Sequence, residues 1–197
     1  MNRCTDRTEA IALAAGARVV QEDARNLSKI RNKGLAAATG DIVVTVDADS
    51  RLHPMTFHDA HLKLSQDDCI GGGCLLLPER WSVGIILTGL ALLPYLARYR
   101  VSVGCFWTLR ETSEAIGGFN PDFITVEDVD YALRLKAYGK ERGKKFGCLY
   151  RAALVTSCRK FDQHGEWHLL KNPSFLRKVF QGNNQEIGDS YWYKPGR

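Results

Sequence analysis

The segment from Gly40 to Pro54, GDIVVTVDADSRLHP, places the strongest constraint on the fold of this chain. Residues 42–46 form a β-branched run without helical periodicity, which predicts a buried strand of a parallel sheet. Asp47 and Asp49 follow directly, at the carboxyl end of this strand, where open α/β sheets bind their ligands. The segment therefore predicts an α/β fold with a ligand site at this edge of the sheet.

Asp47 and Asp49 are separated only by Ala48, and two carboxylates at this spacing suit a hard divalent cation. Mg²⁺ and Mn²⁺ take one or two carboxylates, keep some water and fill their remaining positions with phosphate oxygens. The expected cofactor is therefore Mn²⁺ or Mg²⁺ and the expected ligand a diphosphate. The alternative is that both aspartates only cap the helix that follows Pro54.

Composition indicates an ordinary globular protein: the 197 residues are 45% hydrophobic and 25% charged. We expect one domain over residues 1–180 and a loosely ordered polar tail over residues 181–197. The net charge of +5 favours anionic substrates or a lipid surface, while the basic residues are too dispersed to indicate nucleic-acid binding. Six cysteines without a C-x-x-C pair, and an N-terminus without the apolar core of a signal peptide, predict a reduced cytoplasmic protein.

Helix and strand signals alternate along the chain. The spacing predicts a β-α-β unit, with a strand over 17–21, a helix that ends at Gly40 and the central strand. The helix carries Arg31, which could pair with phosphates at the ligand edge; for its neighbours Arg25, Lys29 and Lys33 a solvated helix face is the favoured interpretation. Further helices are expected over 54–64, 110–115 and from a Thr125 cap to Gly139, and further strands over 70–77, 101–108 and 149–157.

Residues 81–97, WSVGIILTGLALLPYLA, carry no charge and are flanked by arginines. Their length is at the lower limit of a membrane span, and glycines and a proline interrupt them. Three roles stay open: packing in the core or in a homodimer, a helix on a membrane surface, and a transmembrane segment. Peripheral membrane association of a cytoplasmic protein is therefore one expected behaviour.

Five motifs, in their usual order, resemble the GT-A glycosyltransferases of family 2. They are T-D-R-T at 5–8, R-N-K-G-L at 31–35 with A-T-G-D at 38–41, V-D-A-D-S at 46–50, I-G-G-F at 116–119 and E-D-V-D-Y-A-L-R-L at 127–135. The resemblance implies a GT-A, Rossmann-like fold with a mostly parallel sheet. It also implies an inverting transfer from a nucleotide-sugar donor to an acceptor saccharide, lipid or other hydroxyl compound.

The resemblance also implies roles for individual residues. Asp49 would coordinate the metal, and Asp47 would reach the ribose or the metal's water shell. Asp128 would be the base that deprotonates the acceptor hydroxyl, with Glu127 beside it at the helix start. The remaining implied contacts are Arg31 to phosphate, Gly117 and Gly118 in the acceptor-side turn, Trp167 on the substrate side, and His164 to the metal or a phosphate.

The chain departs from the family pattern in two places. The family's first strand, helix and second strand precede the T-D-R-T motif, so we expect a domain that is partial at its N-terminus. Processive members carry Q-x-x-R-W, whereas residues 163–167 read QHGEW, with Glu166 where arginine would stand. The expected activity is therefore transfer of a single sugar.

Two alternatives to an active transferase stay open. A truncated or degenerate transferase fold could serve as a non-catalytic binding or scaffold subunit. A phosphohydrolase of the haloacid dehalogenase kind also places D-x-D after a buried strand, but it has Thr or Val where this chain has Arg51.

Overall fold

The computed structural model describes residues 1–102 and 104–192. Its strands are β1 (Ile42–Val46), β2 (Ser50–Arg51), β3 (Cys69–Pro78), β4 (Cys105–Leu109) and β5 (Lys145–Thr156). Its helices are α1 (Thr8–Ala14), α2 (Leu27–Ala37), α3 (Thr56–Ser65), α4 (Val83–Tyr99), α5 (Arg110–Ala115), α6 (Glu127–Lys140), α7 (Arg159–His164), α8 (His168–Lys171), α9 (Pro173–Phe180) and α10 (Gln185–Trp192).

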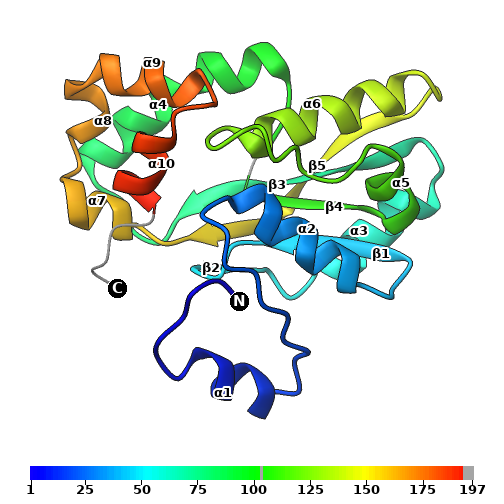
Figure 1. Cartoon of the computed structure of the whole chain (residues 1–197). Helices are drawn as coiled ribbons and strands as arrows, with labels where there is room; N and C mark the ends of the chain where they lie inside the picture. Colours follow the sequence, from blue (N-terminus) through cyan, green and yellow to red (C-terminus); the bar gives the residue numbers. More distant parts are fainter. Residues whose placement is uncertain (103, 193–197) are drawn as a thin grey trace.

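The strands form one sheet in the order β1-β4-β3-β5-β2 (Figure 1). β3 and β5 pair in parallel, whereas β4 is antiparallel to both β1 and β3, and β2 is antiparallel to β5. Strands β1, β3 and β5 therefore run in the same direction, so the carboxyl ends of these strands point to one edge. The predicted α/β class, a sheet flanked by helices, is confirmed. The sheet is mixed and not mostly parallel as expected, because β3 and β5 are the only neighbours among the described strands that pair in parallel.

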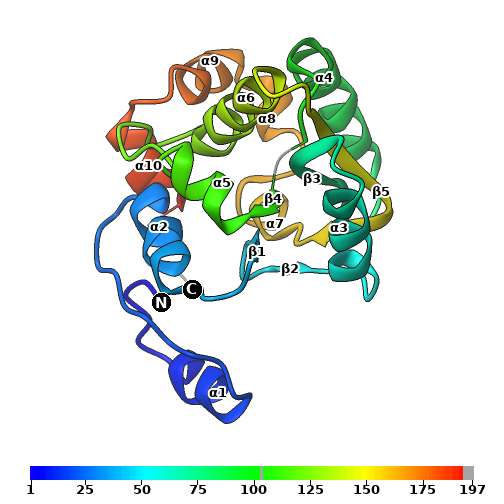
Figure 2. The same ribbon diagram turned by 90° about the vertical axis from the view of Figure 1, so that its right-hand side faces the viewer.

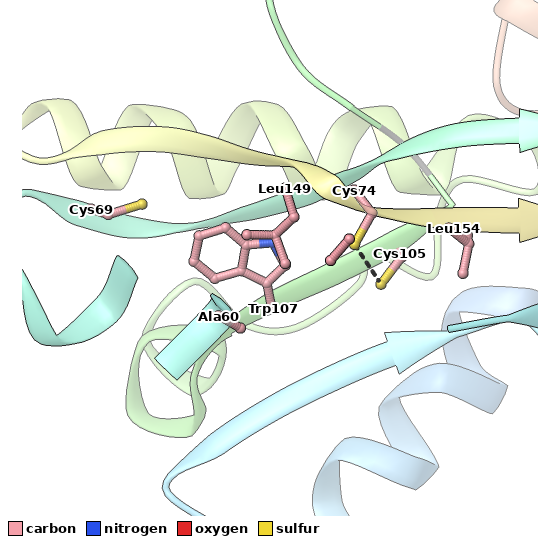
Figure 3. Close-up of a cluster of buried hydrophobic side chains, with 8 residues drawn as sticks. Ala60, Cys69, Cys74, Cys105, Trp107, Leu149 and Leu154 are labelled. Atoms are coloured by element: carbon pink, nitrogen blue, oxygen red, sulfur yellow. Dashed lines mark hydrogen bonds between the residues drawn. The ribbon is translucent and has the colours of Figure 1, made fainter. Parts of the chain in front are cut away.

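Apolar side chains alternate along β4 and divide the core between the two faces of the sheet. Trp107 and Cys105 join a buried cluster with Ala60 of α3 on one face, which Figure 3 shows in close-up. Phe106 points to the other face and packs against Phe119 and against residues of α6. The fold consequently has three layers, with α3 on one face of the sheet and α6 on the other.

Most of the cysteines serve as small core residues. Cys69, Cys74, Cys105 and Cys158 are buried free thiols. The Sγ atoms of Cys74 and Cys105 lie 3.5 Å apart on neighbouring strands (Figure 3). The contact with Cys74, together with burial, raises the pKa of Cys105 above its ordinary value, so that thiol stays protonated.

The glycine run at the start of β3 allows close packing of strands. A Cβ atom built on Gly72 would lie 2.0 Å from the backbone oxygen of Gly147 in β5. Equivalent atoms on Gly71 and Gly73 would lie 2.6 Å from Thr108 and 2.2 Å from Ser102. The run therefore accommodates neighbouring chain segments of the sheet.

Three local expectations are wrong. Residues 17–21 are extended but form no strand of the sheet; they lie along the first residues, where Glu22 N donates to Met1 O. β1 is an edge strand of the described sheet, and among its residues only Val43 is buried, because β4 alone lies beside it. Residues 185–192 form α10, anchored by the buried side chain of Ile187, whereas a loose tail was expected; residues 193–197 lie outside the described part.

The uncharged segment over 81–97 forms most of α4, which lies on the same side of the sheet as α6 (Figures 1 and 2). One face is buried, through Gly84, Ile85 and Thr88. The opposite face exposes large aliphatic side chains that are 41–65% accessible, namely Val83, Ile86, Leu87, Leu90 and Leu93. No helix in the described residues has the length and apolarity that a membrane crossing requires. The expected strand over 101–108 is shorter, as β4, and its residue 103 lies outside the described part.

Candidate active site

Three side chains of α2 attach that helix to the loop before α6. Asn26 caps α2 by accepting a hydrogen bond from Lys29 N, and its amide donates to Pro121 O at 2.8 Å. Ser28 Oγ donates to Asn120 O, also at 2.8 Å. Asn32 makes two bonds with the backbone of Phe119, accepting at 2.8 Å and donating at 2.7 Å. These bonds fix the position from which Arg31 projects.

Arg31 joins two carboxylates that are far apart in the sequence. Its Nη2 lies 2.8 Å from Asp47 Oδ1, at the end of β1, and its Nη1 lies 2.6 Å from Glu127 Oε1, at the start of α6. The guanidinium is 11% exposed and also lies over the ring of Phe119, 5.1 Å from the centroid. The paired carboxylates outweigh burial and raise the pKa of Arg31, so it stays charged. The structure thus brings together residues that the sequence places in separate motifs.

Glu127 and Asp128 begin α6 after an unusual turn. Val126, the residue before them, has φ of 57°, a left-handed conformation that β-branched residues rarely adopt. The prediction that Thr125 caps the helix is wrong: its hydroxyl donates to Val179 O at 2.5 Å, because α9 lies against this turn. The amides of residues 124 and 125 both donate to Gly182 O, so the end of α9 holds the strained turn in place.

A cavity of about 370 Å³ opens beside these carboxylates. Arg31, Asp47, Glu127 and Asp128 line one part of it. Tyr191 lines it as well, and all the other described lining residues have aliphatic or phenyl side chains. The polar part holds three carboxyl groups and one guanidinium, so it is net negative once more than one carboxyl is ionised, which favours a cation.

Burial and nearby carboxylates disfavour ionisation of Glu127 and Asp128, the first two residues of α6. Burial raises the pKa of Glu127 above its ordinary value, the charge of Asp128 raises it further, and Arg31 opposes both effects. Burial also raises the pKa of Asp128, against the opposing charge of Arg31. A carboxylate with a raised pKa is a stronger base, and Asp128 lines the cavity.

Asp49 lies on the same turn as Asp47 but contacts a different cation. Its Oδ2 lies 2.8 Å from Nη2 of Arg159, the first residue of α7. Asp47 and Asp49 are 42% and 43% exposed, so both can be reached by a ligand. Within residues 1–102 and 104–192, no three His, Cys, Asp or Glu side chains are grouped to hold a metal ion. A cation at Asp47 and Asp49 would therefore need further ligands from outside these side chains, such as the oxygens of a diphosphate.

The other predicted site residues lie apart from this cluster. His164, on α7, stacks on Tyr191 with ring centroids 4.6 Å apart, and its metal role stays a prediction. Trp167 precedes α8, is 43% exposed, and is not among the described residues that line the cavity.

Gly117 and Gly118 form a left-handed turn that lines a second, smaller hollow of about 350 Å³. The T-D-R-T motif lies at α1, which projects from the body in Figures 1 and 2 and has no buried residue.

Two features of the site were missed at the level of the sequence. Arg159 pairs with Asp49 across 110 positions, and nothing in the motif of either residue signals that contact. Part of the apolar wall of the cavity comes from α4, α8 and α9. The i+3 and i+4 spacing of Phe175, Leu176, Val179 and Phe180 could have indicated the contribution of α9.

The fold is that of the GT-A glycosyltransferases, as comparison with solved structures shows. TarS of S. aureus in complex with UDP-GlcNAc superimposes with a TM-score of 0.60 at 14% identity, over 98% of this chain and 65% of that one. Glucosyl-3-phosphoglycerate synthase of Mycobacterium tuberculosis, in complex with Mn²⁺, UDP and phosphoglyceric acid, superimposes with a TM-score of 0.54 at 20% identity, over 86% and 63%. The same enzyme has also been solved with Mg²⁺ and UDP.

The resemblance to family 2 is confirmed for the first part of the chain. Residues 2–75 match the family model described as Glycosyl transferase family 2. A TPR repeat-containing protein of Synechococcus elongatus is 39% identical over 66 residues, which are 33% of this chain and 16% of that protein. The chain thus spans about a sixth of this curated relative and less than two thirds of the TarS and synthase chains.

Proposed function

We propose that this chain carries the active site of a glycosyltransferase that moves a single sugar from a nucleotide-sugar donor to an acceptor hydroxyl, with inversion. One observation carries the proposal: Arg31 joins Asp47 and Glu127 at a cavity that Asp128 also lines. In the motifs that resemble family 2, Arg31 and Asp47 belong to the donor side, and Glu127 and Asp128 belong to the helix start that carries the base. The family match and the fold support the same reaction class.

In the proposed reaction, Asp128 accepts the proton of the acceptor hydroxyl as the oxygen attacks the anomeric carbon of the sugar. The bond between that carbon and the diphosphate oxygen breaks, and its electron pair leaves with the nucleoside diphosphate. One displacement from the opposite side inverts the configuration. Mn²⁺ or Mg²⁺, held by Asp49 and Asp47, would supply positive charge against the diphosphate.

Arg31 and Glu127 position this chemistry. The Arg31 guanidinium holds the end of β1 against the start of α6. The proposed metal-binding turn and the proposed base therefore keep a fixed position relative to each other. The bond from Val129 N to Asp128 Oδ1, at 2.7 Å, leaves the second carboxylate oxygen for the acceptor. Because most of the cavity wall beside Asp128 is aliphatic or phenyl, few other protein groups would compete with the carboxylate for the acceptor hydroxyl.

The test compares Asp128→Asn with Glu127→Gln, using a panel of nucleotide-sugars with alcohol and saccharide acceptors. If Asp128 is the base, Asp128→Asn lowers kcat by roughly 10²–10⁴ and leaves nucleoside diphosphate affinity nearly unchanged. Glu127→Gln loses its charged bond to Arg31, so it should lower the melting temperature as well. If Asp128→Asn keeps full activity while Glu127→Gln is inactive despite remaining folded, the base is assigned to the wrong residue.

A binding or scaffold subunit is the second candidate. The observation in its favour is that Asp47 and Asp49 each pair with an arginine, which a bound metal would have to displace or share. This candidate requires that the chain bind nucleoside diphosphate without transferring or hydrolysing any sugar of the panel. Turnover that is lost in Asp128→Asn excludes it.

A further inference from the structure

The walls of the cavity beside Asp128 differ from what a saccharide acceptor needs. The cavity is lined by apolar side chains, among them Leu92 of α4, Leu169 of α8, and Phe175 and Leu176 of α9. Its main polar part is the end that holds the carboxylates. A saccharide presents hydroxyl groups around its whole ring, and each one needs a hydrogen-bond partner when buried. An aliphatic wall leaves those groups without partners.

The second hollow of the molecule offers the opposite chemistry. Asn32, Arg110, Ser113 and Glu114 line that hollow, which could hydrogen-bond a sugar ring. Its lining includes neither Asp128 nor Asp47 among the described residues, so the groups that would bond a sugar lie in another hollow from the proposed base.

We infer that the acceptor is an alcohol with an apolar body, of alkyl, isoprenyl or aryl type, whose hydroxyl meets Asp128 while its body lies against α4, α8 and α9. This inference rests on the proposed transferase function and names its acceptor class. A cavity of about 370 Å³ holds a body on the order of ten non-hydrogen atoms. A longer chain would extend past Leu76, which lines the cavity and is 41% exposed.

Two leucines of α4 provide a matched pair of variants. Leu92 lines the cavity, whereas Leu90 is 56% exposed. Two positions along a helix correspond to about 200°, so the two side chains point to nearly opposite sides. Leu92→Gln places an amide in the apolar wall, while Leu90→Gln makes the same chemical change on the outer face.

Transfer assays would compare n-octanol with methyl glucoside, each with a panel of nucleotide-sugars. We expect kcat/KM for octanol to exceed that for methyl glucoside by at least tenfold. Leu92→Gln should lower the octanol value about tenfold, and Leu90→Gln should leave it unchanged with octanol in solution. Equal or better use of methyl glucoside, with no effect of Leu92→Gln, overturns the inference while leaving the transferase function intact.

Direct binding separates failure of the acceptor class from failure of the proposed function. Ligand-observed NMR should detect octanol but not methyl glucoside on the unmodified protein, and Leu92→Gln should weaken the octanol signal. If no donor supports transfer but this binding pattern holds, the apolar site stands and the transferase function fails. If octanol does not bind, the inference is wrong regardless of activity.

A long-chain alcohol could reach the site from solution or from a bilayer. The same prenyl alcohol would be offered in detergent micelles and in phosphatidylglycerol vesicles. A loss of transfer in Leu90→Gln with vesicles alone identifies the bilayer as the source. Equal activity of Leu90→Gln in both preparations identifies a free alcohol.

Discussion

At the scale of single residues, Arg31 determines the electrostatic state of the site. It lies between Asp47 and Glu127, and its charge lowers the pKa values of Glu127 and Asp128, which burial raises. A general base acts when deprotonated, so activity should rise with pH through the shared titration of these two carboxyls. The pH at which activity rises therefore measures how strongly Arg31 lowers these pKa values.

Arg31→Gln should move the ascending limb of the kcat/KM profile to higher pH. Without the cation, burial and the neighbouring carboxylates raise the pKa values of Glu127 and Asp128 further, so a higher pH is needed to deprotonate the base. Arg25→Gln is the control, because it removes the same charge from a half-exposed arginine. Arg25 Nη1 lies 3.8 Å from Asp189 Oδ1, which is a long ion pair. A limb that stays in place or moves to lower pH contradicts this role.

The residues of the cluster could be predicted from sequence, but their contacts could not. The order of the motifs is enough to name Asp47, Glu127 and Asp128 as partners in one site. The pairing of Asp49 with Arg159 depends on how β2 and β5 meet, since Ser157 N donates to Asp49 O there. Such a contact is a property of the tertiary fold, and neither local sequence contains it.

At the scale of elements, α4 presents two apolar faces. Its inner face packs on the body and its outer face exposes five aliphatic side chains, with Trp81 exposed before the helix and Arg98 exposed at its end. Aromatic and basic residues at the ends of an apolar face are typical of helices that lie on a membrane surface. We therefore expect α4 to bind anionic bilayers.

The test is flotation with phosphatidylglycerol vesicles. The unmodified chain should float with the vesicles. A double variant that carries both Leu87→Lys and Leu90→Lys should remain in the lower fractions. Size-exclusion chromatography of the same proteins examines the other possibility, a homodimer through this face. A monomer that ignores anionic vesicles would contradict both roles of the exposed face.

The close contact of β3 and β5 predicts a strong response to a single methyl group. Gly72→Ala would place a Cβ 2.0 Å from Gly147 O, so the strands must separate, at a cost of about 1–3 kcal/mol of unfolding free energy. Gly34→Ala, in α2, meets no atom within 4 Å and should stabilise by about 0.5–1 kcal/mol. Urea unfolding of both variants measures the two effects. An equal response of the two variants would show that packing between β3 and β5 is unimportant.

The helices and most strands were predictable because their periodicity and their turn residues are local. The sequence predicted β1 as well, but not its place at the edge of the sheet, since strand order depends on long-range pairing. Residues 17–21 have the composition of a strand and remain unpaired with the sheet, because composition does not supply a neighbouring strand.

At the scale of the whole molecule, ligand binding should appear as added stability. The excess negative charge of the cavity favours Mn²⁺ or Mg²⁺ together with a nucleoside diphosphate. At ligand concentrations of about 100 times Kd, binding adds about 2.7 kcal/mol. For a chain of this size, that raises the melting temperature by about 5–11 °C.

Thermal unfolding with Mn²⁺, with UDP and with both would measure this effect. Asp49→Ala should abolish the additional shift that the combination produces. His164→Ala tests whether that histidine contributes a ligand, because a retained shift would remove His164 from the metal site. If Asp49→Ala keeps the full shift, the metal is not bound at the turn after β1.

The bond between Thr125 and Val179 has a consequence for the newly synthesised chain. The two residues are 54 positions apart, and at roughly 5–20 residues per second the ribosome needs about 3–11 s to add that length. Until then, the strained turn before Glu127 lacks the carbonyl groups that hold it. The acidic pair is therefore made early but gains its enclosed surroundings only when the last helices have left the ribosome.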